Sequence, residues 1–246
     1  MIRPAQERAR FVTSVALIAA LAESAAACGT RWEAEREYLA GLGARKGEAS
    51  GTPLEHFNRA IELDGTNAAY YEARSMEHSN GLRFAAALRD IDKAVSLSPR
   101  PYLLFERGFC KLDVGMPAAG LEDFQLALRQ APLQAQFYKG VAEAEMDLDR
   151  PDEALGAIDR ALLVGPQVVE WRYVRGVALS RLGRREDAIA QFDRTSACTQ
   201  SASPGLPEIV VFYNGATEYE RTRTLSPPEI RREYREHEFA VCSSKR

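Results

Sequence analysis

The residue types that most often carry chemistry are thinly spread along this chain of 246 residues. Its three histidines are His56, His78 and His237, and no two of them have the spacing of metal ligands. The zinc-protease motif H-E-x-x-H is absent from the sequence, and so is the C-x-x-C pair of many metal and redox sites. We therefore predict no metal site, no cofactor and no enzymatic activity.

Two other features could be mistaken for reactive sites. The segment GLGARKG at 41–47 has the glycines and the lysine of a phosphate loop. It lacks the preceding strand and the G-K-[ST] ending that such a loop needs, so we interpret it as a helix contact followed by a turn. Cys110 has no neighbouring histidine in the sequence to activate it. A small core residue is the better interpretation of this cysteine.

A repeat with a period of about 34 residues organises most of the chain. One sequence pattern, in which a large apolar residue follows a small one by four positions, recurs in segments 87–99, 121–132, 154–166 and 188–200. The distance from Phe124 to Ile158 is 34 residues, and the same distance separates Ile158 from Phe192. A second helical pattern precedes each segment and has its own small residue, at Ser75, Gly108, Ala142 and Gly176. Self-similarity at this period indicates a stack of helix pairs.

These positions resemble the tetratricopeptide (TPR) repeat family, whose unit is a 34-residue helix–turn–helix. The resemblance implies an all-α fold, a TPR helix–turn–helix solenoid wound as a right-handed superhelix, with about five repeats and a C-terminal capping helix pair. In the first and last units Gly65 and Gln200 stand where the family has its closing proline. We assign the five units to residues 34–67, 68–100, 101–134, 135–168 and 169–202.

Helix packing explains this repeated pattern of small and large apolar residues. Two antiparallel helices approach closely only where one offers a small side chain, so Gly108 and Gly176 should mark crossing points. Phe124, Ile158 and Phe192 should fill the space between neighbouring units. We expect the turns inside the helix pairs at Gly115, Asp149 and Gly183, with Pro117 and Pro151 near the starts of second helices, where a missing N–H is tolerated.

The N-terminus has the three parts of a secretory signal peptide, which we assign to residues 1–27. Three arginines lie within the first ten residues, an apolar run extends from Phe11 to Ala22, and small residues follow. The alternatives are an amphipathic N-terminal helix and an uncleaved anchor. The run falls short of the roughly 20 apolar residues that span a bilayer.

Cys28 follows the small residues directly, before a short segment at 28–33. The sequence Ala26-Ala27-Cys28 resembles the end of a bacterial lipoprotein box, which would make Cys28 a lipidated first residue after cleavage. Ala25-Ala26-Ala27 also fits an ordinary A-x-A cleavage site, so lipidation and simple secretion both remain open. We expect a protein of the bacterial envelope, in the periplasm or on the outer membrane. The alternative is a cytosolic TPR adaptor without a true signal peptide.

Residues 203–246 are predicted to form a hinge and a degenerate capping helix pair. Residues 221–246 contain seven Lys or Arg and four Glu, a composition that suits either a solvated capping face or an anion-binding site. Cys198 and Cys242 are expected near the C-terminal ends of neighbouring second helices. In an oxidising compartment they could form a disulfide, and the alternative is two unpaired thiols. The chain's net charge is −3, and no basic stripe indicates nucleic-acid binding.

The family resemblance implies a concave groove, lined by first helices, that holds a segment of a partner protein. Mapped onto this sequence, the groove has an aromatic centre, which predicts an apolar peptide or an amphipathic helix of an envelope protein as the partner. The alternative is that some of these rings belong to the interhelix core or are covered by the protein's own cap. The predicted groove residues are Tyr38, Met76, Tyr102, Phe105, Phe109, Lys139 and Tyr173.

Overall fold

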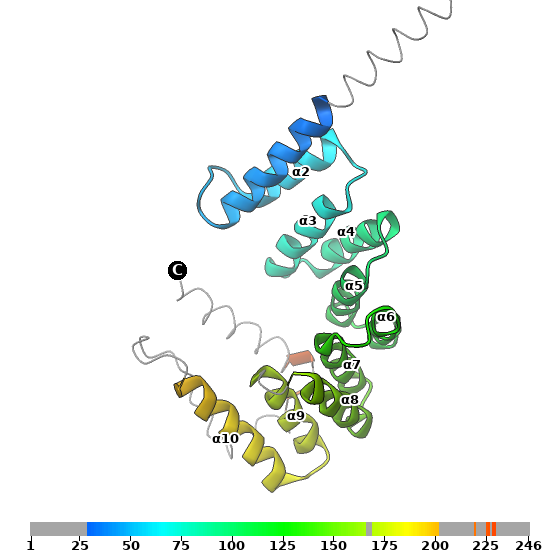
Figure 1. Cartoon of the computed structure of the whole chain (residues 1–246), viewed down its shortest axis with the longest axis vertical. Helices are drawn as coiled ribbons and strands as arrows, with labels where there is room; N and C mark the ends of the chain where they lie inside the picture. Colours follow the sequence, from blue (N-terminus) through cyan, green and yellow to red (C-terminus); the bar gives the residue numbers. More distant parts are fainter. Residues whose placement is uncertain (1–28, 166–168, 202–218, 220–224, 227, 230–246) are drawn as a thin grey trace, which may run out of the picture. The chain divides into compact units, whose positions relative to one another are not determined.

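The computed structural model describes residues 29–165, 169–201, 219, 225–226 and 228–229 (Figure 1). Every regular element among these residues is a helix. The chain divides into two compact units, Met1–Ser98 and Pro99–Arg246. The all-α helix–turn–helix fold predicted from the repeat is confirmed.

Unit 1 contains two helical hairpins. A helix over residues 29–45 precedes α2 (Pro53–Leu63), and α3 (Ala68–Asn80) packs against α4 (Phe84–Leu97). Arg45 joins the first hairpin to the second, because its Nε lies 2.7 Å from Glu77 Oε1 and its Nη2 donates to the Ala73 carbonyl at 3.3 Å. Buried Phe57 and Tyr70 contribute the largest core side chains of this unit.

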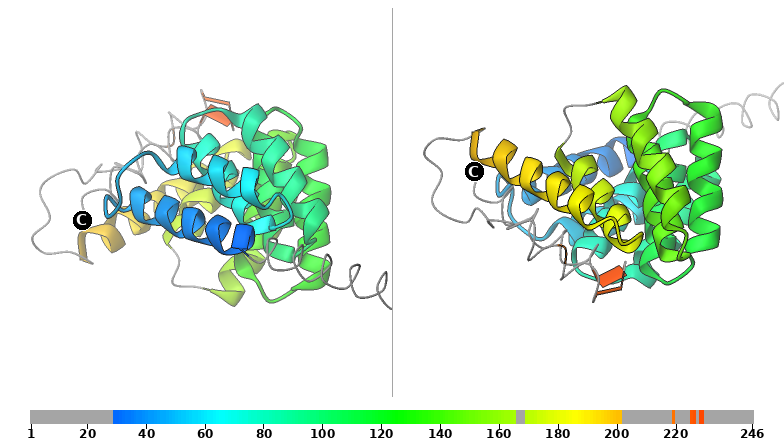
Figure 2. Two further views of the ribbon diagram at one scale, coloured as in Figure 1. Left: turned by 90° about the horizontal axis from the view of Figure 1, so that it is seen from above. Right: turned by 90° about the horizontal axis from the view of Figure 1, so that it is seen from below.

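Unit 2 contains three hairpins, whose first helices are α5, α7 and α9. In both views of Figure 2 the green helices α5 to α8 stand side by side, and consecutive helices contact one another. Contacts also join α5 to α7 and α7 to α9, so the first helices of successive hairpins form one layer. The bounds are α5 Pro101–Asp113, α6 Pro117–Gln130, α7 Ala135–Asp147, α8 Pro151–Val164, α9 Val169–Arg181 and α10 Arg185–Ser201.

The helix starts coincide with the sequence assignment. Hairpins begin at Ala68, Pro101, Ala135 and Val169, the first residues of four assigned units. The predicted signal peptide, Cys28, the side chain of Cys198 and Cys242 lie outside the described residues. Most of the capping segment at 203–246 lies outside them as well.

The helices cross where a glycine faces a phenylalanine, as the sequence pattern predicted. A Cβ on Gly108 would lie 2.5 Å from Phe124 Cε1, and a Cβ on Gly140 would lie 2.6 Å from the same ring. Phe124 therefore packs onto glycines of two helices, α5 of its own hairpin and α7 of the next. Gly41 meets Phe57, and Gly176 meets Phe192, at the same distance of 2.5 Å. All three phenylalanines are fully buried.

The turns inside the hairpins share one backbone geometry. The second turn residue has a positive φ in four hairpins, with values of 55° at Leu82, 78° at Gly115, 57° at Asp149 and 72° at Gly183. The next residue's N–H closes the turn on a carbonyl five positions back, as from Met116 to Lys111 at 2.8 Å. Three of these positions were predicted as turns. Leu82 was not, and it is the one whose side chain fits a positive φ least well.

Because glycine tolerates a positive φ and leucine does not, substitutions at Gly115 and Leu82 should change the free energy of unfolding in opposite directions. Gly115→Ala should lower the free energy of unfolding by about 1 kcal/mol, through backbone strain alone. The added methyl would meet no atom within 4 Å. Leu82→Gly should raise stability by about 0.5–1 kcal/mol, because relief of strain exceeds the entropy that glycine adds to the unfolded chain. Urea denaturation midpoints measure both changes, and equal signs for the two variants would contradict this interpretation of the turns.

Candidate partner-binding surface

The aromatic side chains of α5 form the clearest candidate surface. Tyr102, Phe105 and Phe109 recur every three or four residues, so they share one face of the helix. The Tyr102 side chain is 45% exposed, while Phe105 and Phe109 are half-buried. Ring centroids are 6.1 Å apart from Tyr102 to Phe105 and 4.9 Å apart from Phe105 to Phe109. Together these three rings are called the aromatic row.

The inner edge of the aromatic row, formed by Phe105 and Phe109, packs against the core. Phe105 lies 5.7 Å from Phe124 and 5.1 Å from Phe137, and both of those rings are buried. Phe109 lies 5.1 Å from Phe124 in an edge-on arrangement. These contacts fix the row in place: one edge packs inside and the other faces outward.

Charged side chains of α7 border the row. The Lys139 ammonium lies 5.7 Å from the centroid of Phe109, a cation–π distance. It also lies 3.5 Å from Glu143 Oε1, one helical turn away. Oε2 of Glu143 is buried and has no hydrogen-bond partner among the described residues. The row thus has an apolar centre and a polar border, the composition of many peptide-binding surfaces.

Tyr173 on α9 does not continue the row. Its side chain is only 2% exposed, and its ring lies 5.6 Å from buried Phe192. The sequence mapping placed this residue in the groove, and we reassign it to the core of the last hairpin. The misplacement has a physical cause, since Tyr173 lies in a core cluster that includes Tyr219, a residue far along the chain whose position helix periodicity cannot reveal.

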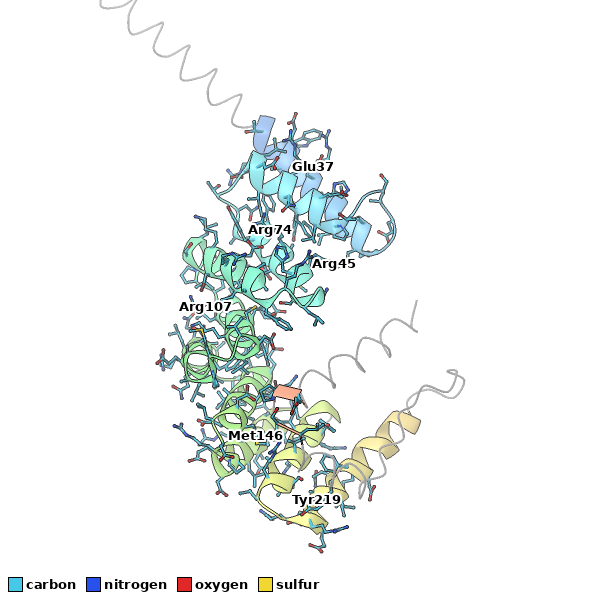
Figure 3. All side chains as sticks on the ribbon, turned by 180° about the vertical axis from the view of Figure 1, so that it is seen from behind. Glu37, Arg45, Arg74, Arg107, Met146 and Tyr219 are labelled. Atoms are coloured by element: carbon cyan, nitrogen blue, oxygen red, sulfur yellow. The ribbon has the colours of Figure 1, made fainter. Side chains whose placement is uncertain are left out.

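The C-terminal part of the chain reaches this same end of unit 2. Tyr219, labelled in Figure 3, is buried in the cluster that also contains Tyr173. Its backbone carbonyl accepts a hydrogen bond from Ser180 Oγ at 3.3 Å, and its ring lies 5.2 Å from the Arg185 guanidinium carbon. The described C-terminal residues therefore contact both α9 and α10.

Two predicted groove residues lie in unit 1. Met76 on α3 is 40% exposed. Tyr38 is half-buried, with its ring 5.2 Å from Tyr70 and 6.0 Å from Phe57. Of the pair, only Met76 presents much surface for contact.

The parts of the chain that the structure describes contain no metal-binding arrangement. There, no three His, Cys, Asp or Glu side chains are placed to hold a metal ion. Cys110 is buried on α5, the location expected of a core residue. None of the described helices has the length and apolarity that crossing a bilayer requires.

The sequence interpretation missed two buried charge clusters, one in each unit. In unit 2, Asp123 binds the Arg107 guanidinium through both oxygens, at 2.6 and 2.8 Å, and its Oδ2 also lies 2.7 Å from Lys111 Nζ. In unit 1, Asp90 binds Arg74 at 2.7 and 2.8 Å. Figure 3 labels both arginines. These clusters clamp the first helix of a hairpin to the second.

A signal for both clusters exists in the sequence. The second hairpin has His78 where the third has Lys111, four residues after the arginine and twelve before the aspartate. The pattern R-x3-[HK]-x11-D thus occurs in two successive repeats. Nε2 of His78 lies 3.6 Å from Asp90 Oδ2, while its buried Nδ1 has no hydrogen-bond partner among the described residues.

Two histidines of unit 1 should titrate on opposite sides of the ordinary value of 6.5. The pKa of His56 is raised because its ring nitrogens face the Ser50 carbonyl and Glu37 Oε2, each at 2.8 Å. The pKa of His78 is lowered because burial disfavours its charged form, despite Asp90 nearby. NMR titration of the ring protons, assigned with His56→Gln and His78→Gln, measures both values. The reverse order would contradict the geometry.

The two shifts act on stability with opposite signs. The contribution of His56 is present below the unfolded pKa and is lost as the pH rises through its folded pKa. His78 is held neutral in the folded state, so its contribution is lost as the pH falls through 6.5 toward its folded pKa.

Comparisons with known proteins agree with the helical hairpins. A family model described as "Tetratricopeptide repeat" matches residues 111–162 and 142–203. "DnaJ homolog subfamily C member 7" of Mus musculus is 29% identical over 163 residues, which cover 58% of this chain and 33% of that protein. "Small glutamine-rich tetratricopeptide repeat-containing protein 2" of Saccharomyces cerevisiae is 32% identical over 76 residues, which cover 30% of this chain and 22% of that protein. The chain therefore spans a third or less of these curated relatives.

Solved structures share the fold at low sequence identity. A tetratricopeptide repeat protein from Parabacteroides merdae is 15% identical, with a TM-score of 0.61, covering 78% of this chain and 74% of that one. PilF of Pseudomonas aeruginosa is 13% identical, with a TM-score of 0.59, covering 83% and 99%. The MamA protein is 14% identical, with a TM-score of 0.58, covering 71% and 98%. At these identities the likeness extends to the fold alone.

Proposed function

We propose that this chain, whose repeats and fold resemble those of tetratricopeptide repeat proteins, is a non-enzymatic scaffold that binds a segment of another protein on the first helices of its hairpins. The fold is typical of interaction modules. A stack of hairpins offers a broad surface and can position one partner without chemistry of its own.

The aromatic row is the observation that supports this proposal best. Tyr102 exposes a large ring on a rigid helix, and Phe105 and Phe109 continue the apolar surface beneath it. Rings held in place lose little conformational entropy on binding, and aromatic residues often dominate interface energetics. We propose a partner that offers apolar side chains, as an extended peptide or as one face of an amphipathic helix. Lys139 and Glu143 border that contact.

Capture of the partner from an envelope extract tests the surface. Tyr102→Ala should weaken capture by about 1–3 kcal/mol, or roughly five- to 150-fold, because the variant removes an exposed ring and little packing. Leu163→Ala is the matched control, since Leu163 is 82% exposed but lies on α8, a second helix. Equal capture by Tyr102→Ala and the parent protein would reject the row as the binding surface.

We place the scaffold in the bacterial envelope, held by lipid at Cys28. The three-part pattern of residues 1–27 and the small residues before Cys28 support this location. The alternative remains a cytosolic TPR adaptor.

Cell fractionation and mass spectrometry of the mature N-terminus distinguish the two locations. We expect a lipidated Cys28 as the first residue, and Cys28→Ser should move the protein from the membrane to the soluble periplasmic fraction. An intact Met1 on cytosolic protein would overturn the envelope location, while an unmodified Cys28 would overturn the lipid anchor alone.

A further inference from the structure

The helix over residues 29–45 has one face that no described part of the protein covers. Trp32 is 65% exposed and Leu39 is 57% exposed, and Arg36 lies between them on the same side of the helix. The Arg36 guanidinium carbon lies 5.4 Å from the centroid of the Trp32 ring. Trp32, Arg36 and Leu39 are called the outer face. A group of exposed apolar side chains on one face can mark a contact with a membrane or a partner.

The opposite side of this helix packs against the rest of unit 1. Ala34 is fully buried, and Gly41 lies against the Phe57 ring. Glu35 Oε2 accepts a hydrogen bond from the Tyr70 hydroxyl at 3.0 Å, and Glu37 Oε2 lies 2.8 Å from His56 Nδ1. These two carboxylates thus bind groups on α2 and α3, and Figure 3 labels Glu37. The outer face combines the apolar Trp32 and Leu39 side chains with the Arg36 guanidinium, whose Nη2 lies 3.9 Å from Glu37 Oε1. Exposed Glu33 and Glu35 lie beside this face on the same helix.

That composition suits the interface between water and a lipid bilayer. Tryptophan is enriched at headgroup level because its ring is apolar while its N–H remains able to donate. An arginine can lay its apolar stem along the membrane and direct its guanidinium to a phosphate. A leucine one turn further adds apolar area to the same side of the helix.

The position of the helix in the chain brings it to such a surface. Cys28, the residue that we propose to be lipidated, immediately precedes residue 29, the first helical residue that the structure describes. At 1.5 Å per residue, Trp32 lies only about 5 Å along the axis from residue 29, and Leu39 about 15 Å. We infer that the outer face lies against the phospholipid surface to which the lipid at Cys28 is anchored. This inference rests on the proposed lipidation.

A second copy of the chain is the competing occupant, and the geometry favours lipid. Three side chains are a small area compared with the roughly 1,200 Å² that stable protein interfaces bury. A lipid anchor at Cys28 would also hold the outer face within a few residues of the membrane, so the effective concentration of the membrane surface would be high.

The two tryptophans of the chain make the inference measurable. Trp171 is buried in the core of unit 2, at 7% exposure, so Trp32 is the accessible one. The mature protein, purified from the envelope, is placed in phosphatidylcholine vesicles, with or without bromine atoms near the headgroup end of the acyl chains. The difference in emission between the parent protein and Trp32→Phe isolates the Trp32 signal. Flotation and N-terminal mass spectrometry of the same sample first establish lipidation and vesicle attachment.

We expect Trp32 emission to shift to shorter wavelength on vesicles and to lose most of its intensity with brominated lipid, while Trp171 emission stays constant. Full Trp32 emission on brominated vesicles that carry attached, lipidated protein would overturn the inference. A blue shift that grows with protein concentration in detergent, without response to bromine, would assign the face to a second copy and also overturn it. Protein that lacks the lipid and does not float would instead fail the proposed anchor, a result that flotation identifies separately.

Discussion

Replacing Asp123 by alanine is expected to lower the free energy of unfolding by about 3–5 kcal/mol. The Asp123 side chain is 5% exposed and lies within 2.8 Å of groups on both Arg107 and Lys111. Its removal would leave two mostly buried cations on α5 without their shared counter-ion. Removal of one partner of a buried ion cluster is far more destabilising than the net contribution of the cluster suggests.

Asp159→Ala is the matched control for that experiment. Asp159 also binds an arginine, with its Oδ1 2.6 Å from Arg175 Nε, but its side chain is 47% exposed. Water can solvate Arg175 after the change, so we expect a loss of at most about 1 kcal/mol. Urea denaturation followed by circular dichroism measures both variants. Similar losses for Asp123→Ala and Asp159→Ala would show that burial does not set the strength of these pairs.

Phe124→Ala is the second change with a large expected effect, a loss of about 3–5 kcal/mol. Phe124 is fully buried against α5 and α7, where two glycines leave room for its ring. Tyr102→Ala, which removes a ring of similar size from an exposed site, should change stability much less. Thermal and urea denaturation measure both.

The glycine contact itself can be tested by combining changes. Gly108→Ala alone should destabilise the hairpin, because its methyl group would come within 2.5 Å of the Phe124 ring. In the Phe124→Ala background the same methyl enters vacated space, so the double variant should be more stable than the sum of the single losses predicts. Strict additivity would contradict the close contact of Gly108 with Phe124.

The repeat fold could be predicted because its causes are local and periodic. Gly108 and Gly176 stand at a fixed depth in first helices, and each meets the phenylalanine sixteen residues later. Gly115 and Gly183 have the backbone freedom that a turn requires, and the structure gives them positive φ values. Leu82 escaped notice because Gly81, the obvious turn residue, lies one position earlier and has an ordinary negative φ.

The candidate surface was harder to predict because exposure depends on distant parts of the chain. Helix periodicity places Phe105 and Tyr173 at equivalent positions of α5 and α9. The structure leaves the first half-buried and buries the second, which lies in the cluster that includes Tyr219 from the C-terminal segment. The Arg107–Asp123 pair was missed for a similar reason, since its partners are sixteen residues apart and meet only in the folded hairpin.

Site-specific photo-crosslinking in living cells tests the central proposal most directly. A photoreactive phenylalanine analogue at Tyr102 samples the aromatic row, and the same group at Leu163 samples a more exposed site on a second helix. We predict that light produces one discrete crosslinked partner from position 102 and none from position 163, with the crosslink mapping to an apolar segment of that partner. Equal or absent crosslinking at both positions would contradict the account of this protein as a scaffold that binds its partner on the aromatic row.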